Sequence, residues 1–440
     1  MRVFIGVLLL MGLTRQSSFN LYWTTDRFLE MLGFREIISR DRFLSILSVF
    51  HVVDNSKQKP RDHPEYDKSF KIRPLLNMLL PLWQKYFHLQ KEISVDESMI
   101  PFKGRTSYMQ YMPKKPHKWG LKAWGLADAR TGYMWNWQLY VGKEDRPNAE
   151  GKGLAHRVVA ELAEPLYGKG HVLYMDNFFS SSPLFQELAN NQMGACGTIR
   201  TNRKGVPDAI KKAKLRPGQP PVTARDQKLL YISWYDKRAV NLATTAHTDE
   251  MFEKTVRSKH HPEHRRVVNK LCAVEAYTQH MGGVDRADKQ MTHYMMLHRN
   301  NKWWKKVFFY LFEVTFCNIL VIWKALRGTR VNAEQFRLKV AHHLLDGYRP
   351  GTSSRKGRKA ENPPDRIIMN DHFPGINPKR LPSGKPSRPD CIVCTDRDKK
   401  RHQTQYICKK CNVPLCLFPC FERYHTLVNY KVECTADLHQ

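Results

Sequence analysis

The 440-residue chain is long enough for two or three domains, and its 42% hydrophobic and 11% aromatic residues exclude a wholly disordered protein. Lysine and arginine total 72 against 41 acidic residues, which gives a net charge of +31. So many positive charges repel one another in a folded protein unless a polyanion neutralises them. The composition therefore predicts contact with nucleic acid. The alternative is a basic soluble protein of another kind, such as a ribosomal one.

Residues 1–90 are predicted to be helical. The apolar run Val3–Leu13 resembles a signal peptide, but no small-x-small cleavage site follows it, so we expect a buried core helix and keep a secretory signal as the alternative. Asp26–Phe28 is expected to open a helix. Ser39–Leu47 and Ile72–Phe87 carry apolar residues at helical spacing.

In residues 91–200 the pattern changes to short runs in which apolar and polar residues alternate or all residues are apolar. Such runs are typical of strands. The predicted strands are Glu92–Asp96, Trp119–Leu126, Tyr133–Val141, His171–Met175 and Ala195–Ile199, with helices at Gly153–Leu166 and from Ser182. Three antiparallel-type strands followed by helix, strand, helix and strand is the element order of a ribonuclease-H-like α/β domain.

Residues 201–263 are basic and interrupted by prolines, and we interpret them as an insertion with strand-like runs at Leu229–Trp234 and Ala239–Thr245. From residue 265 to 346 the chain is expected to be helical again. The α/β domain resumes over 264–297, and a second helical part covers 298–347.

The apolar run Val307–Trp323 contains Glu313 and Asn318 and is short for a membrane span, so it predicts a buried helix. Residues 348–389 form a basic linker in which Ser354–Lys359 is either a nuclear import signal or a solvated tether. Neither segment predicts contact with a membrane.

Four aspartates lie at positions where sheets of this kind bind ligands. Asp96 lies on the first strand, Asp176 ends the fourth, and Asp285 and Asp288 share one face of a helix. Attack on a phosphodiester uses two hard cations about 3.5–4 Å apart, and carboxylates are the ligands that such cations prefer. The alternatives are ordinary ones: helix caps for Asp176 and Asp285, and an exposed strand end for Asp96.

Four segments resemble the conserved blocks of piggyBac-type transposases. Asp96–Arg105 is similar to the first catalytic block, Tyr111–Gly120 to the next, Tyr174–Ser181 to the second catalytic segment and Met281–Asp288 to the third. The resemblance runs from Met1 to about His425. It implies that Asp96, Asp176 and Asp285 hold two Mg²⁺ or Mn²⁺ ions, with Asp288 as a further essential acid.

The resemblance also implies an architecture and an activity. A ribonuclease-H-like core with an insertion would be flanked by helices, Met1–Phe87 and His298–Leu345, that bind double-stranded DNA and form a homodimer. The activity implied is nicking of transposon ends, hairpin formation and joining to TTAA targets in the nucleus. The chain begins inside the first flanking helix, without the acidic arm usual upstream in this family.

Two other classes of function remain open. One is a domesticated, catalytically silent protein that binds DNA or chromatin, and the other is an interaction protein that acts through its cysteine-rich tail.

Three basic runs are predicted to contact DNA, because cationic side chains neutralise phosphates and neighbouring aromatic rings stack on unpaired bases. The residues chosen are Lys103, Arg105, Lys114, Lys115, Lys118, Arg203, Lys204 and Lys302. The alternative for the first run is an exposed loop that packs its aromatic rings on the sheet.

Seven of the ten cysteines fall between Cys391 and Cys434, and their close pairs indicate metal rather than disulfides. The predicted zinc ligands over residues 390–428 are Cys391, Cys394, Cys408, Cys411, Cys416, Cys420 and His425.

The tail resembles the cross-brace domain of piggyBac-like proteins, which helps to recognise transposon-end DNA. By that resemblance Cys391, Cys394, Cys416 and Cys420 bind one ion, and Cys408, Cys411 and His425 share a second. His402, Cys434 or His439 would complete the second ion. Ubiquitin-ligase or histone-tail binding is an alternative on fold grounds alone.

Overall fold

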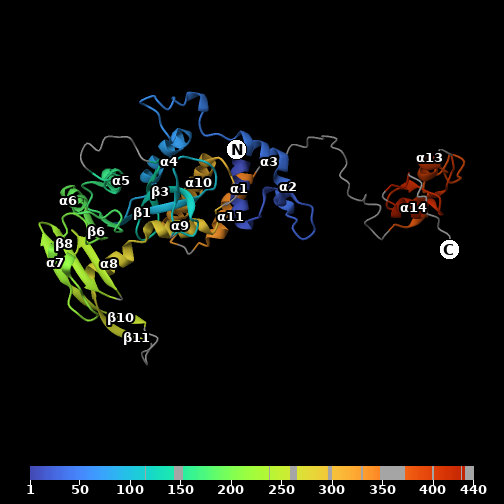
Figure 1. Cartoon of the computed structure of the whole chain (residues 1–440). Helices are drawn as coiled ribbons and strands as arrows, with labels where there is room; N and C mark the ends of the chain where they lie inside the picture. The colour runs from blue at the N-terminus through green and yellow to red at the C-terminus, as the bar shows by residue number, and fades with distance from the viewer. Residues whose placement is uncertain are drawn as a thin grey trace. The chain divides into compact units, whose positions relative to one another are not determined.

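The computed structural model describes residues 1–113, 115–142, 152–236, 238–257, 265–295, 300–328, 331–346, 372–398, 401–427 and 429–431. The chain divides into a first unit, Met1–Pro350, and a second unit, Gly351–Gln440 (Figure 1). The predicted import segment Ser354–Lys359 lies outside the described residues, as does Lys114.

Helices from both ends of the first unit pack together into its helical part. α1 (Arg2–Thr14) buries Phe4, Val7 and Met11 and packs against α11 (Ala333–Leu345), so the prediction of a core helix at the N-terminus is confirmed. The other helices of this part are α2 (Leu32–Ile37), α3 (Arg40–Val49), α4 (Arg73–Tyr86) and α10 (Trp303–Arg327), with single turns at Phe19–Trp23, Asn55–Lys57 and Phe70–Ile72.

Among the described residues, α10 alone is long and apolar enough to cross a membrane, but the protein covers most of it. The Asn318 side chain donates to the Met134 carbonyl at 2.8 Å and accepts from the Met134 amide at 2.9 Å. Glu313 is paired with Arg337 of α11, and both side chains are buried. Because its polar groups find partners inside the protein, α10 is a core helix, as predicted.

Nine strands among the described residues form the central sheet of the first unit, in the order β2-β3-β1-β5-β6-β9-β8-β7 with β4 on β3. They are β1 (Glu92–Pro101), β2 (Met109–Tyr111), β3 (Trp119–Asp128), β4 (Met134–Leu139), β5 (Val172–Met175), β6 (Gly194–Thr198), β7 (Val222–Asp226), β8 (Leu229–Tyr235) and β9 (Ala239–Thr244).

The pairing pattern confirms the ribonuclease-H-like core. β3 runs antiparallel to both β4 and β1, whereas β1, β5 and β6 run parallel to one another. β9, β8 and β7 continue the sheet beyond β6, so much of the predicted insertion is continuous with the core. β10 (Met251–Arg257) and β11 (Arg265–Leu271) form a separate two-stranded ribbon (Figure 1).

Two predictions about the elements are wrong. Asp26 opens a turn instead of a helix, because its carboxylate accepts from the Phe28 amide at 2.9 Å and closes the chain locally. Arg265–Leu271 is a strand where a helix was expected, and it pairs with β10. The adjacent Val267 and Val268 are β-branched residues, which favour a strand.

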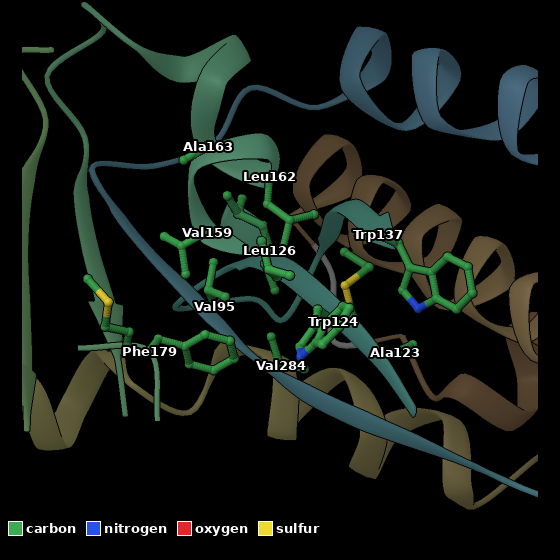
Figure 2. Packing of buried hydrophobic residues seen from close by; sticks show 14 of the residues in the cluster. Val95, Ala123, Trp124, Leu126, Trp137, Val159, Leu162, Ala163, Phe179 and Val284 are labelled. Carbon is green, nitrogen blue, oxygen red and sulfur yellow. The ribbon is translucent and has the colours of Figure 1, made fainter. Parts of the chain in front are cut away.

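Helices cover both faces of the sheet. α5 (Leu154–Ala163) and α6 (Ser182–Asn190) contact the sheet, and Val159 and Leu162 of α5 approach Val95 and Leu126 (Figure 2). On the opposite face, α9 (Gly283–Thr292) crosses β1 and β3 with Val284 turned inward. The remaining helices are α7 (Asp208–Lys212), α8 (Cys272–His280) and the single turn Glu164–Leu166.

The start of α9 lies unusually close to the sheet. A Cβ atom on Gly283 would overlap Ser94 Oγ of β1 and would lie 3.0 Å from the Asp128 carbonyl oxygen. The backbone oxygen cannot move without disturbing the β3–β4 turn, so only glycine allows this approach. The neighbouring Gly282 has open space around the same position.

We expect Gly283→Ala to destabilise the first unit by about 1–3 kcal/mol, because the added methyl group forces α9 away from β1. Alanine has a higher helix propensity than glycine, so propensity alone would stabilise the variant. A loss of stability would therefore result from the steric clash. Gly282→Ala is the matched control: it loses the N-cap preference for glycine but meets no atom within 4 Å, so it should lose less stability than Gly283→Ala. Urea unfolding followed by tryptophan fluorescence measures both, and equal stabilities of the two variants would contradict the close approach.

Candidate functional site

Two parallel strands bring Asp96 and Asp176 next to each other. The β1–β5 register pairs Val95 with Met175; Asp96 is the next residue of β1, and Asp176 directly follows the last residue of β5. Paired residues of parallel strands point to the same face, so the two carboxylates share one face of the sheet at the carboxyl end of β5. The Asp176 carboxylate also accepts from the Phe178 amide at 2.8 Å, which fixes the chain where it leaves the strand.

α9 supplies the other two acids from across the sheet. Ser98 Oγ donates to the Asp288 carboxylate at 3.1 Å, and the Tyr310 hydroxyl lies 3.4 Å from the same oxygen. Gly283 touches Ser94 and Asp288 touches Ser98, so α9 is held to β1 on both sides of Asp96. Asp285, which lies between these two contacts on α9, is exposed.

The acids of β1, β5 and α9 affect one another's ionisation. Burial, and then the charges of Asp285 and Asp176, raise the pKa of Asp96 to about 7. Burial also raises the pKa of Asp288 to about 6, with a further contribution from Asp285. The pKa of Asp176 is raised by burial and by the nearby Glu97.

The set of donors fits hard divalent cations. Among the described residues, at least three ligand atoms come within 4.8 Å of one another only in the two cysteine–histidine groups of the second unit. In the described residues, no three of the carboxylates therefore offer oxygen atoms that all lie within 4.8 Å of one another.

Lys115 is a cation that lies beside these acids. Its ammonium group donates to the Glu97 carbonyl at 3.0 Å, and its charge lowers the pKa of both Asp96 and Asp288. Lys115 also lines a cavity of about 350 Å³ together with Asp285 and Asp288. The sequence placed it only in a DNA-contacting loop, because its proximity to the acids depends on the folded loop.

The other residues predicted to contact DNA have different surroundings. Lys103, Arg105, Lys118, Lys204 and Lys302 are exposed. Arg203 instead donates to the carbonyls of Asn177 and Phe178, at 3.3 and 2.9 Å, so it supports the chain that follows Asp176.

The second unit gathers its cysteines and histidines into two interleaved groups. They are Cys391, Cys394, Cys416 and Cys420 in the first, and His372, Cys408, Cys411 and His425 in the second. Cys394 Sγ lies 3.6 Å from Cys420 Sγ and 4.0 Å from Cys416 Sγ. Tetrahedral zinc with Zn–S bonds of about 2.3 Å separates sulfur atoms by about 3.8 Å, so the first group fits zinc.

His372 is a ligand position that the sequence analysis missed. Its Nδ1 lies 3.4 Å from Cys408 Sγ and 3.3 Å from Cys411 Sγ, although the predicted linker extended to residue 389. His402 lies instead beside the first group, with Nδ1 3.2 Å from Cys416 Sγ, and the predicted Cys434 and His439 lie outside the described residues.

Short elements of the second unit support these ligands. β12 (Pro374–Ile376) pairs with β13 (Tyr406–Cys408), and this pairing brings His372 to Cys408. The remaining elements are β14 (Val413–Pro414), α13 (Ile392–Asp398) and α14 (Cys420–Thr426).

Without added Mg²⁺, we expect the first unit to lose stability as the pH rises. An acid whose pKa is raised on folding binds more protons in the folded protein, so stability falls between pH 3.8 and about 7 for Asp96 and then levels off. Asp96→Asn removes this loss and should melt several degrees higher than the unmodified chain at about pH 8, with the difference vanishing in acid.

Tryptophan fluorescence measures this melting, because all ten tryptophans lie between Trp23 and Trp323 in the first unit. The exposed Asp249→Asn is the control. An Asp96→Asn protein with the pH profile of the unmodified chain would show that Asp96 is not buried among other acids.

Zinc release tests the ligand assignment. His372→Ala should release one of two zinc ions at a lower chelator concentration, because one of four ligands of the second group is lost. His402→Ala should keep both ions as tightly as the unmodified chain. A colorimetric zinc indicator follows the titration, and the opposite ranking of the two variants would overturn the assignment.

Comparison with protein families gives two matches. The family model described as Transposase IS4 matches residues 1–319, and that described as DDE_Tnp_1-like zinc finger matches residues 379–426.

Two relatives from Homo sapiens are similar over most of this chain. PiggyBac transposable element-derived protein 3 is 27% identical over 97% of this chain and 70% of its own length. PiggyBac transposable element-derived protein 2 is 25% identical over 84% of this chain and 63% of its own length.

Among solved structures, the cryo-EM structure of a piggyBac transposase synaptic complex with hairpin DNA matches with a TM-score of 0.70 at 22% identity. The match covers 94% of this chain and 85% of that one, and it shows a common fold. Because the first family model covers most of the chain and the relatives and the fold agree with it, the chain belongs to the piggyBac-type transposase family.

Proposed function

We propose that this protein is a DNA transposase that cleaves DNA strands and transfers them with the help of divalent metal ions. The observation that carries the proposal is the convergence of Asp96, Asp176 and Asp285 on one face of the sheet, with Asp288 beside them. Partly buried acids whose pKa values are raised by desolvation and by neighbouring negative charge are costly to ionise unless a cation neutralises them, and this cost supports a metal site.

The four acids have two different parts in the proposal. Asp96, Asp176 and Asp285 would hold two Mg²⁺ or Mn²⁺ ions, and Asp288, bonded to Ser98, keeps α9 in place beside them. Bound ions of this kind activate the attacking oxygen and stabilise the leaving oxygen in phosphodiester chemistry.

The proposed reaction follows the family. Water attacks a phosphorus atom at the transposon end, the bond to the 3′ oxygen breaks, and a 3′-hydroxyl is released. That hydroxyl attacks the opposite strand and forms a hairpin, which is later opened, and it finally joins a TTAA target.

The partners are part of the same proposal. The structural neighbour was solved as a synaptic complex with hairpin DNA, which supports double-stranded DNA as the substrate here. The net charge of +31 supports it independently. Assembly as a homodimer, action in the nucleus and binding of transposon ends by the zinc-bearing second unit complete the proposal.

A second candidate function is DNA or chromatin binding without cleavage. The names of the human relatives favour it, because both are described as transposable element-derived proteins. The four aspartates are all retained here, which favours the enzyme.

Cleavage of DNA that carries the terminal repeats flanking the gene separates the two candidates. We expect nicks that require Mg²⁺, and we expect Asp176→Asn to reduce their rate at least about a hundredfold while DNA binding persists. Asp208→Asn, an exposed aspartate on α7, is the matched control and should cleave normally. An unmodified protein that binds this DNA but never cuts it would favour the second candidate.

A further inference from the structure

A basic cavity of about 570 Å³ lies in the first unit, apart from the four acids. Three elements enclose it: the segment from Asn55 to Lys71, the loop Arg105–Tyr108 that follows β1, and Trp303 at the start of α10. These segments are distant in sequence, so the cavity exists only in the folded protein.

Positive charge dominates the walls of this cavity. The cationic residues that line it are Lys59, Arg61, Lys68, Lys71 and Arg105, and none of the residues lining it is acidic. Within the described parts of the chain, no carboxylate pairs with Lys59, Arg61, Lys71 or Arg105. The neighbouring Asp67 is bonded to Arg73 instead, with 2.7 Å between Nε and the carboxylate oxygen.

The rest of the lining also favours an anion. The N-terminal end of a 25-residue helix carries partial positive charge, and no side chain caps α10 there. Tyr108 is buried edge-on against Trp303 with ring centroids 5.4 Å apart. Tyr108 lines the cavity, and its buried hydroxyl lies beside Thr106.

We propose that this cavity binds the phosphate backbone of the DNA strand at a fixed distance from the acidic site. The inference rests on the proposed function, since it requires that the protein binds DNA. Unpaired cations gathered around one space repel each other, and successive phosphates of one strand would relieve that repulsion at several points. A small free anion would neutralise only part of the cluster.

The chain itself limits how far this contact lies from the acids. Arg105 follows Asp96 by nine residues, which span at most about 30 Å when extended. At about 3.4 Å of rise per nucleotide, the bound phosphates lie within roughly nine nucleotides of the backbone position at the acids. A contact at that distance would set the register of the strand across the acidic site.

Neutralising two of the cations tests the proposal. In the double variant Lys71→Gln with Arg105→Gln, the negative slope of log affinity against log salt should become shallower by about 1 to 2. Its affinity for DNA should be about tenfold weaker at low salt. The matched control is Lys324→Gln with Arg327→Gln, which removes the same charge at the other end of α10, roughly 36 Å away. The control should keep the slope of the unmodified protein.

Neutral methylphosphonate linkages, placed one at a time along the strand, locate the contact. At one or two positions within about nine nucleotides of the cleavage point, we expect the neutral linkage to weaken DNA binding by the unmodified protein. The same linkages should not weaken DNA binding by the double variant. Equal sensitivity of both proteins at every position would overturn the proposal. So would tight binding of inorganic tripolyphosphate that leaves DNA affinity unchanged, because the cavity would then hold a free anion.

These outcomes are separable from those of the cleavage experiment. An unmodified protein that fails to bind DNA at all would contradict the proposed function. DNA binding with an unaltered salt slope in the double variant would contradict the cavity assignment alone. Binding is measured without Mg²⁺, so loss of catalysis does not affect the result.

Discussion

The close packing of α9 on β1 is the constraint on which the acidic site depends. Gly283 lets the helix approach the strand, and Ser98 bonds to Asp288 one turn beyond Asp285. Four carboxylates are thereby held on one partly buried face, where burial and neighbouring negative charge raise the pKa values of Asp96, Asp176 and Asp288. The fold supplies the energy that keeps these acids together, and a bound cation would relieve the repulsion that remains.

The long helix α10 connects this site to the rest of the first unit. Tyr310 reaches Asp288, and Asn318 bonds to the edge of β4 through Met134. The buried Lys305 donates to the Leu47 carbonyl near the end of α3, and Glu313 pairs with Arg337. An apolar helix with four such polar contacts can adopt only one orientation, because each contact would be left unsatisfied by a rotation. The acids therefore rest on a rigid support.

Alternating or apolar runs predicted strands over Glu92–Asp96 of β1 and His171–Met175 of β5, and the stretch expected to be helical from residue 265 onward includes α9. These patterns could not predict that the acids of β1, β5 and α9 meet, because that depends on pairing between residues 80 to 190 positions apart; only the resemblance of four short segments to a family supplied it. His372 escaped prediction because it is 36 residues from Cys408 and has no neighbouring ligand of its own. Arg203 was assigned to DNA from its charge alone, which carries no information about the carbonyls that it meets.

The central claim is that β1, β5 and α9 together bind metal ions, and iron-directed cleavage of the polypeptide tests it most directly. Fe²⁺ bound in place of Mg²⁺ generates hydroxyl radicals with ascorbate and peroxide, and these cut the backbone beside the ion. The account predicts cuts near Asp96, Asp176 and Asp285 together, all suppressed by excess Mg²⁺ and lost in Asp96→Asn. Cuts confined to one of these three segments, or cuts that persist unchanged in the variant, would contradict a shared metal site.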